Sequence, residues 1–256
     1  MITVSELSKH FKVGRKLRKE LDPDVLVDGK VKAVDKISFE CHPGRVFGLI
    51  GPNGAGKTTA LRMIATMLKP TAGGFSVDGV DGVAEPQKVR EHIGFLTGNT
   101  GLYDRLTATE MVRYFANLHG LDADRFETRR REVFQALDMD EFAKRRISQL
   151  STGMRQKVSI ARTIIHDPRV VVFDEPTAGL DVMTSRAIVN LIRTCREQGK
   201  TVLFSTHLMG EVKLLCDDIA IIHHGRLFFS GTKEEFEAQM TQPSYEDEFI
   251  QLVGEA

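Results

Sequence analysis

The chain has 256 residues, 41% of them hydrophobic and 27% charged, and its 35 basic residues balance its 35 acidic ones. This size and composition are ordinary for a soluble chain with a substantial core, and a net charge of +0 gives no whole-chain electrostatic case for binding nucleic acid or an anionic membrane. The apolar runs have the length of strands, far short of the roughly 18 residues of a membrane span. Three scattered cysteines, Cys41, Cys195 and Cys216, argue against a disulfide framework or a zinc site, and we expect reduced thiols.

The chain begins with two predicted strands, at residues 2–7 and 33–39, and the first segment lacks the charged-then-apolar order of a signal peptide. Residues 12–32 between them are polar, and we expect an exposed loop or hairpin. A basic cluster in this excursion contains Lys12, Arg15, Lys16, Arg18 and Lys19. A plain solvated surface is the simpler interpretation, and contact with lipid headgroups or a partner is the alternative.

A strand–loop–helix unit follows. Residues 46–50 form a short apolar run that ends at glycine, which is typical of a buried strand in a parallel sheet. A helix is predicted from Lys57, with Leu61, Ile64, Ala65 and Leu68 on its inner face. Further strands are predicted at 170–173 and 202–205, with a crossover helix near 182–198 between them, and a hairpin at 219–223 and 227–230.

The middle of the chain is richer in charge and is predicted to be helical. Thr107 and Glu110 form a capping box ahead of one helix, and Asp124 is expected to cap a second. We therefore predict one domain over 1–256. It comprises an α/β core at 1–98 and 167–231, a helical subdomain at 99–166 and a helical tail at 232–256.

The loop after the first buried strand fits the pattern G-x-x-x-x-G-K-[ST], which cradles phosphates. Glycines allow its backbone N–H groups to turn inward around an anion, and the following helix N-terminus adds positive potential. Lys57 is expected to contact the β- and γ-phosphates, and Thr58 to ligate Mg²⁺. The predicted nucleotide-binding residues are Gly51, Pro52, Asn53, Gly54, Ala55, Gly56, Lys57, Thr58 and Thr59.

Two carboxylates, Asp174 and Glu175, end the buried strand at 170–173. Parallel strands end at the same sheet edge, where ligands bind, so Asp174 is expected to reach the Mg²⁺ held by Thr58. Glu175 is expected to polarise the attacking water. Adjacent acids at the end of an apolar strand are costly unless a cation compensates them, and solvated acids are the alternative interpretation.

The segment Leu150-Ser151-Thr152-Gly153-Met154-Arg155-Gln156 narrows the family, because it resembles the signature of ABC ATPases, most often written LSGGQ. Taken alone it is an N-cap at Ser151 followed by an amphipathic helix. Asp174 follows Ser151 by 23 residues, close to the separation in that family. The resemblance extends over nearly the whole chain, apart from residues 12–32.

The resemblance also assigns roles to isolated residues. The segment 176–181 resembles the family's D-loop, which ends at Asp181. His207 follows a predicted strand and matches the family's γ-phosphate sensor, although a lone histidine there is usually structural. Phe11 occupies the place of the aromatic residue that stacks on adenine, although a lone phenylalanine is more often core.

The resemblance implies a P-loop NTPase core with a mixed sheet, an N-terminal antiparallel β subdomain and a helical ABC-specific insertion. It also implies an ATP-hydrolysing, Mg²⁺-dependent subunit that dimerises head to tail with a second copy. Ser151, Gly153 and Asp181 would then act in trans on the partner's ATP. A separate membrane permease would dock at 99–106, including Leu102 and Tyr103, and the chain would be cytoplasmic, peripheral on the inner face of the cell membrane. The alternative is a soluble, non-transport ABC ATPase acting on a ribosome or nucleic-acid assembly, although no nucleic-acid partner is expected.

Two departures from the family pattern stand out. Gly98 occupies the place of the Q-loop glutamine and offers no side-chain oxygen to a metal, so Thr97, Asn99 or an extra water is expected to substitute. The signature has Thr152 and Met154 in place of glycine and glutamine. With the segment 97–105, these features resemble the NatA group, ATPase subunits of ABC-2-type exporters associated with sodium extrusion.

Overall fold

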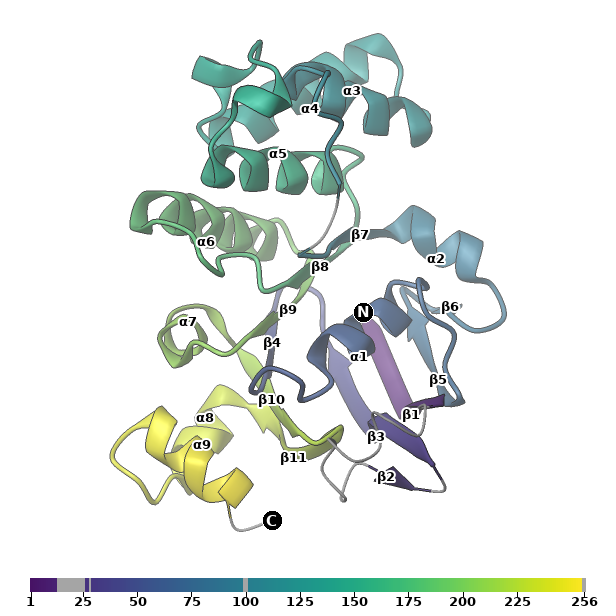
Figure 1. Cartoon of the computed structure of the whole chain (residues 1–256), viewed down its shortest axis with the longest axis vertical. Helices are drawn as coiled ribbons and strands as arrows, with labels where there is room; N and C mark the ends of the chain where they lie inside the picture. Colours follow the sequence, from purple (N-terminus) through teal and green to yellow (C-terminus); the bar gives the residue numbers. More distant parts are fainter. Residues whose placement is uncertain (13–25, 28, 99–100, 255–256) are drawn as a thin grey trace.

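The computed structural model describes residues 1–12, 26–27, 29–98 and 101–254. Figure 1 shows two sheets in the lower and central part of the molecule, with a group of helices at one end and the C-terminal helices at the other. Within the described residues no helix is both long and apolar enough to cross a membrane.

The first sheet is built around the N-terminal strand. Its order is β2-β3-β1-β5-β6, and all its pairings are antiparallel. The strands are β1 (Ile2–Lys12), β2 (Leu26–Val27), β3 (Lys30–Cys41), β5 (Ala72–Val77) and β6 (Val80–Asp81). This confirms the predicted antiparallel β subdomain, with β1 and β3 both longer than expected.

The polar excursion at 12–32 is partly strand at its ends. Lys12 pairs with Lys30 across β1 and β3, and β2 adds a two-residue edge. Of the two forms expected for this excursion, a loop or a hairpin, the paired ends fit the hairpin, because the ladder continues past the last apolar residues. Arg15, Lys16, Arg18 and Lys19 lie outside the described residues.

The second sheet has the order β11-β10-β4-β9-β8-β7. Its strands are parallel except β11, which pairs antiparallel with β10, so the predicted mixed sheet is confirmed. They are β4 (Val46–Ile50), β7 (Ile93–Leu96), β8 (Val170–Asp174), β9 (Thr201–Thr206), β10 (Asp218–His223) and β11 (Arg226–Thr232). Every residue of β4, β8 and β9 is buried, as expected for strands covered on both faces.

Helices connect and cover these strands. Those around the sheets are α1 (Lys57–Ile64), α2 (Pro86–His92), α6 (Val182–Glu197), α7 (Met209–Leu215), α8 (Lys233–Gln239) and α9 (Tyr245–Gly254). The helical end holds α3 (Ala108–Leu118), α4 (Ala123–Ala136) and α5 (Thr152–Ile164), with 3₁₀ turns at Asp140–Phe142 and Ile147–Gln149. These helices fall within the predicted insertion at 99–166, whereas the exact domain boundaries stay a prediction.

Helix capping was predicted correctly in one case and wrongly in another. The capping box of Thr107 and Glu110 at α3 is confirmed. At α4 the N-cap is Asp122, whose side chain accepts from the Arg125 N–H at 2.8 Å, and Asp124 lies inside the first turn.

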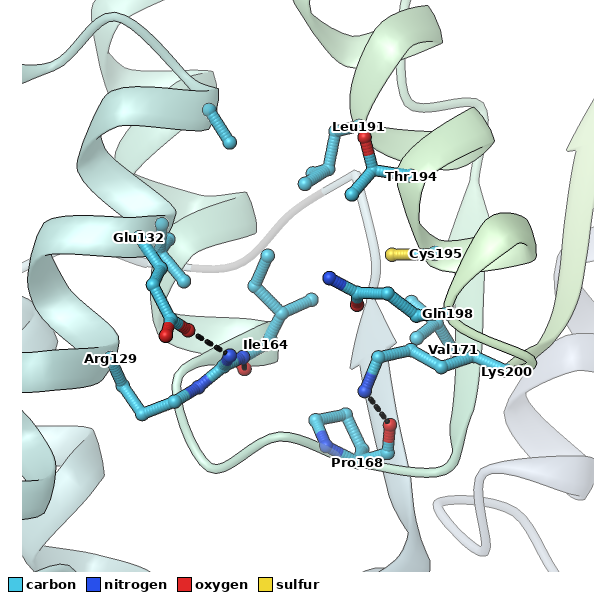
Figure 2. A pocket seen from close by; sticks show the side chains of 12 residues that line it. Arg129, Glu132, Ile164, Pro168, Val171, Leu191, Thr194, Cys195, Gln198 and Lys200 are labelled. Carbon is cyan, nitrogen blue, oxygen red and sulfur yellow. Dashed lines mark hydrogen bonds and ion pairs between the residues drawn. The ribbon is translucent and has the colours of Figure 1, made fainter.

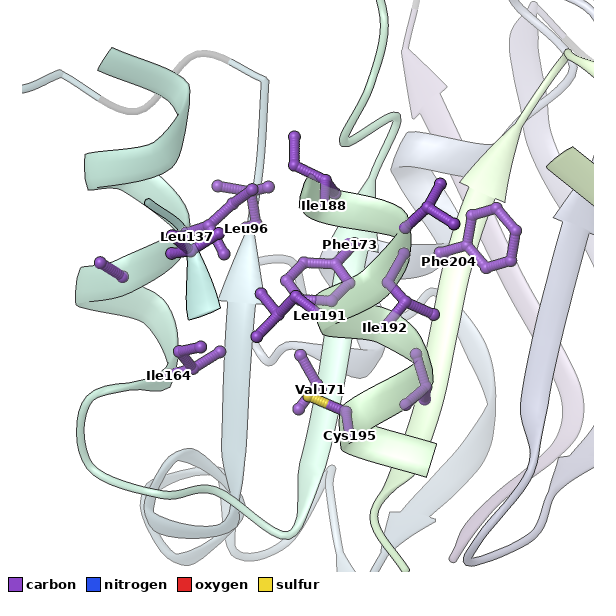
Figure 3. Packing of buried hydrophobic residues seen from close by; sticks show 14 of the residues in the cluster. Leu96, Leu137, Ile164, Val171, Phe173, Ile188, Leu191, Ile192, Cys195 and Phe204 are labelled. Atoms are coloured by element: carbon purple, nitrogen blue, oxygen red, sulfur yellow. The ribbon is translucent and has the colours of Figure 1, made fainter. Parts of the chain in front are cut away.

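The core divides at the six-stranded sheet. Val171 and Phe173 of β8 pack with the helices α3 to α6, whereas Val170 and Val172 face α1 and the first sheet. Figure 3 shows Phe173 against Leu191 of α6. Truncating a fully buried phenylalanine of this kind costs about 3–5 kcal/mol. Side chains therefore pack against both faces of β8 up to the point where its terminal carboxylates begin.

Candidate functional site

The phosphate loop runs from the end of β4 to the start of α1. Gly54 and Gly56 have φ values of 84° and 109°, a left-handed backbone that favours glycine. A Cβ at Gly56 would also lie 2.4 Å from the carbonyl oxygen of Ala33. The loop geometry thus favours glycine at Gly56, which the motif specifies, and also at Gly54, which the motif leaves open.

Lys57 lies at the centre of the site with only 4% of its surface exposed. Its Nζ donates to the carbonyl oxygens of Gly51 at 2.6 Å and Pro52 at 3.1 Å. It also lies 3.1 Å from Oε1 of Glu175. A buried ammonium requires such partners, so Lys57 is held over the loop in a position to meet an anionic ligand.

Thr58 and Asp174 meet directly, as the sequence predicted. The Thr58 hydroxyl donates to Asp174 Oδ1 at 3.0 Å, and the Ser205 hydroxyl donates to the same oxygen at 2.8 Å. Asp174 is 6% exposed, and a buried carboxylate that receives hydroxyl groups still lacks a counter-charge. Thr58 and Asp174 are hard oxygen donors of the kind Mg²⁺ prefers, so the residues fit this cation.

Ser205 is a site residue that the sequence analysis missed. Its hydroxyl donates to Asp174 and accepts a hydrogen bond from the Glu175 N–H at 3.1 Å, and the residue is fully buried. Strand register places it there, because Asp174 pairs with Ser205 in the β8–β9 ladder. A serine at the end of an apolar run was the signal available in the sequence.

Glu175 and His207 come together at the same sheet edge. His207 Nδ1 lies 3.4 Å from Glu175 Oε1, and Glu175 has a left-handed backbone with φ 47°. Burial would raise the pKa of Glu175, but its hydrogen bond to Lys57 and the charges of Lys57 and His207 hold that pKa below its ordinary value. The carboxylate is therefore ionised at neutral pH and can accept a proton.

The signature residues form a separate group. Ser151 caps α5 by accepting from the Met154 N–H at 3.3 Å. A Cβ at Gly153 would lie 2.7 Å from Thr184 Oγ1 and 3.4 Å from Asp181 Oδ2. Figure 1 shows α5 well apart from α1, so Ser151 and Gly153 are remote from the phosphate loop of their own chain.

Asp181 has a structural partner that the sequence did not reveal. It is the N-cap of α6, accepting from the Thr184 N–H at 2.9 Å and from the Thr184 hydroxyl at 2.8 Å. A capped helix start beside Gly153 fixes the D-loop against the signature. The predicted action of Asp181 in trans stays a prediction.

Phe11 lies near the end of β1, opposite Val31, and 40% of its surface is exposed. The Lys9 ammonium lies 5.4 Å from its ring centroid. The ring is thus an accessible aromatic face rather than core, although its stacking on adenine stays a prediction.

Gly98 follows β7, whose residue Leu96 pairs with Phe173 of β8. The β7–β8 ladder ends at this pair, one residue before Asp174. Gly98 is exposed, and a Cβ added there would meet nothing within 4 Å. Thr97 is 7% exposed, and Asn99 lies outside the described residues.

The segment on which the permease is expected to dock is hydrogen-bonded to the signature helix, α5. Buried Arg162 of α5 donates to the Gly101 carbonyl at 3.0 Å and stacks 4.9 Å above the Phe115 ring. Leu102 packs against the core, whereas Tyr103 is 55% exposed and meets the Tyr114 ring edge-on at 5.7 Å.

A cavity of about 110 Å³ lies elsewhere, between α4, α5 and α6 (Figure 2). It is lined by Arg129, Leu191 and Cys195 among others, and by none of the predicted site residues. Cys195 is an unbridged thiol, and burial raises its pKa to about 11. This cavity is therefore separate from the phosphate loop.

Comparison with known proteins places the chain in a family. Residues 34–178 match the family model described as ABC transporter. The chain is 43% identical over 235 residues to the ABC transporter ATP-binding protein NatA of Bacillus subtilis (strain 168), covering 91% of this chain and 90% of that protein. It is 36% identical over 211 residues to the daunorubicin resistance ATP-binding protein DrrA3 of Streptomyces coeruleorubidus, covering 82% and 67%.

Solved structures agree with this placement. An ATP-binding subunit of an ABC transporter superposes with a TM-score of 0.84 at 25% identity, covering 99% of both chains. A dimeric ATP-binding cassette in a post-hydrolysis state, bound to ADP and Pi, gives a TM-score of 0.78 at 26% identity, covering 91% of this chain and 98% of that one. The predicted fold class and family are thereby confirmed, and this chain belongs to the ABC transporter ATP-binding family.

Proposed function

We propose that this chain hydrolyses ATP at a site completed by a second copy of itself and so powers a separate membrane permease. The observation that carries the proposal is the contact of Glu175 with both Lys57 and His207. One carboxylate is thereby joined to the phosphate-loop cation and to the histidine of the neighbouring strand. That arrangement is suited to general-base chemistry beside a phosphate.

Each residue of the site has a separate role in the proposed binding and hydrolysis of ATP. Backbone N–H groups of the phosphate loop and the Lys57 ammonium bind the phosphates. When a γ-phosphate draws Lys57 towards itself, Glu175 is released from that ion pair and accepts the proton of the attacking water. His207, which contacts Glu175, stabilises charge on the γ-phosphate. Thr58 and Asp174 would hold Mg²⁺, which would neutralise part of the phosphate charge.

The need for a second copy follows from the placement of the signature. Ser151 and Gly153 lie at the N-terminus of α5, far from α1 in the same chain (Figure 1). A helix N-terminus favours anions, so it is suited to cap the ATP held by another chain. The dimeric cassette bound to ADP and Pi, which this chain resembles, supports a head-to-tail pair.

The permease is proposed to dock on the helical end. Tyr103, Tyr114 and Leu118 expose 55%, 42% and 65% of their surfaces. Clustered exposed aromatic and aliphatic side chains are typical of interaction sites. The resistance-type ATP-binding relatives support an ABC-2 exporter and a position on the inner face of the cell membrane. The predicted sodium cargo stays a prediction, because cargo contacts the permease.

The alternative of a non-transport ATPase on a ribosome or nucleic acid gains no support. The net charge is +0, and the relatives named above are transporter or resistance ATP-binding proteins.

The test is the Glu175→Gln substitution, which keeps the side-chain shape but removes the base. We expect steady-state ATP hydrolysis to fall by about 10²- to 10⁴-fold, with ATP affinity retained and an ATP-dependent dimer accumulating in size-exclusion chromatography. Lys57→Ala is the companion variant, and it should lose ATP binding itself. A Glu175→Gln chain that hydrolyses normally and stays monomeric with ATP would contradict the assignment.

A further inference from the structure

Glu211, in the first turn of α7, joins the two segments that carry Glu175 and His207. Its carboxylate accepts the Thr206 hydroxyl at Oε2, at 2.6 Å, and the Thr177 hydroxyl at Oε1. Thr206 directly precedes His207, and Thr177 follows Glu175 by two residues. One side chain therefore bridges both halves of the proposed hydrolytic pair.

The two hydroxyl groups have little access to water. Thr206 is 2% exposed and Thr177 is 6% exposed. Buried donors that lose an acceptor are costly, and the two oxygens of a single carboxylate satisfy both. The Thr206 oxygen in turn accepts from the Leu208 N–H at 3.0 Å, which fixes the turn that presents His207.

Strand pairing between β8 and β9 does not fix these two segments relative to each other. The β8–β9 ladder ends at the pair Asp174 and Ser205, and Thr206 remains paired with Ile50 of β4 on its other side. Beyond that pair, the side-chain links between the two segments include the Ser205 contact to the Glu175 N–H, the contact of His207 with Glu175 and the two bonds to Glu211. Of these side chains, Glu211 is the one that bonds to a residue next to His207 and to a residue that follows Glu175.

The signature helix α5 also contacts the segment that follows Glu175. Gln156 of α5 donates through Nε2 to the Pro176 carbonyl at 2.8 Å. Residues 176 and 177 thus lie between Gln156 on one side and Glu211 on the other. Movement of the signature helix would reach Glu175 through this segment.

We propose that Glu211 is a positioning residue for hydrolysis, which sets the distance between Glu175 and His207 and keeps that pair in register with the signature helix. This inference rests on the proposed ATPase function. A carboxylate suits the role because it offers an acceptor to each threonine. Glutamine retains one acceptor and can still span the gap, whereas alanine removes both links.

The test compares steady-state ATPase kinetics of Glu211→Ala, Glu211→Gln and the wild type. We expect Glu211→Ala to lower kcat by about 10- to 100-fold, since small displacements of reacting groups have effects of this size. KM for ATP should stay within about twofold, because the phosphate loop is untouched, and Glu211→Gln should restore part of kcat. The matched control is Glu235→Ala, which removes a carboxylate that accepts from the Thr232 N–H at α8 and should keep wild-type kinetics.

If Glu211→Ala does not fold, the ATPase kinetics of Thr177→Val and Thr206→Val provide the test instead. Each should lower kcat, and combining either with Glu211→Gln should cost less than the sum of the single changes. An unchanged kcat in Glu211→Ala would overturn the inference, as would equal losses in kcat, ATP affinity and melting temperature without rescue by glutamine. A wild-type chain without ATPase activity would overturn the proposed function as well, whereas an active wild type with a fully active Glu211→Ala variant would overturn this inference alone.

Discussion

Charged side chains in the site are placed where water is scarce. Lys57 and Asp174 are 4% and 6% exposed, so each depends on neighbours for its charge to be tolerated. The sequence predicted both, because a phosphate loop and an acidic strand end have recognisable patterns. It did not predict Ser205 or Glu211. The serine at the end of an apolar run gained a role only when strand register placed it opposite Asp174, and the role of Glu211 depends on hydrogen bonds to two threonines that lie 34 and 5 residues away in sequence.

One testable prediction concerns a single residue, Gly98. It lies two residues after Leu96, which pairs with Phe173, and there is open space where its side chain would be. Gly98→Gln should therefore be accommodated and should lower the Mg²⁺ concentration that gives half-maximal ATPase activity, because it adds an oxygen ligand at the sheet edge.

The matched control for Gly98→Gln is Gly101→Gln, where an added Cβ also meets nothing within 4 Å. An Mg²⁺ dependence identical to wild type in both variants would show that position 98 is not at the metal.

At the scale of elements, the long periodic segments were predicted well and their ends less well. Strands β4, β8 and β9 are where their apolar runs placed them, and α6 is the predicted crossover helix. Strands β1 and β3 run further than expected because hydrogen bonding continues into polar sequence. The cap of α4 was misplaced because two acidic residues, Asp122 and Asp124, stand at the possible start, and the pattern alone does not choose between them.

Because the N-cap of α4 is Asp122 and not Asp124, substitutions at these two residues should differ in their effect on the free energy of unfolding. Asp122→Ala should lower the free energy of unfolding by about 1 kcal/mol, because the Arg125 N–H loses its acceptor. Asp124→Ala should cost about 0.5 kcal/mol or less, because it loses only a favourable charge in the first turn. Urea unfolding of both variants checks the order, and a larger loss for Asp124→Ala would restore the original assignment.

A stacked pair of histidines makes the stability depend on pH. His119, after α3, lies parallel to His166, after α5, with ring centroids 3.7 Å apart. Burial, and secondly the neighbouring His119, lower the pKa of His166 from 6.5 to about 4. As the pH drops, His166 therefore takes up a proton in the unfolded chain before it does so in the folded chain. The free energy of unfolding consequently falls between about pH 6.5 and about pH 4.

His166→Gln should reduce this pH dependence, measured as the melting temperature between pH 7.5 and pH 4.5. The matched control is His42→Gln, since His42 has 48% of its side chain exposed and should leave the slope unchanged. A wild-type slope in the His166→Gln variant would assign the acid sensitivity to other groups.

At the scale of the whole molecule, the family motifs predicted an α/β core with an antiparallel β subdomain and a helical end, and both sheets agree. The family resemblance also implied that the site is divided between two copies, and the structure shows how the relevant residues are separated within one chain. Lys57, Asp174, Glu175 and His207 come together on one sheet edge, whereas Ser151 and Gly153 lie at the start of α5, in the helical part of the molecule and apart from α1 (Figure 1). This separation supports the proposal that two copies share each ATP site.

The most direct test of this account is the specific ATPase activity of the wild-type chain as a function of its own concentration. A site shared by two copies predicts that activity per chain falls on dilution, in step with loss of the dimer measured by analytical ultracentrifugation in ATP and Mg²⁺, because mass action governs assembly. An activity per chain that stays constant down to concentrations at which the protein is fully monomeric would contradict the shared site.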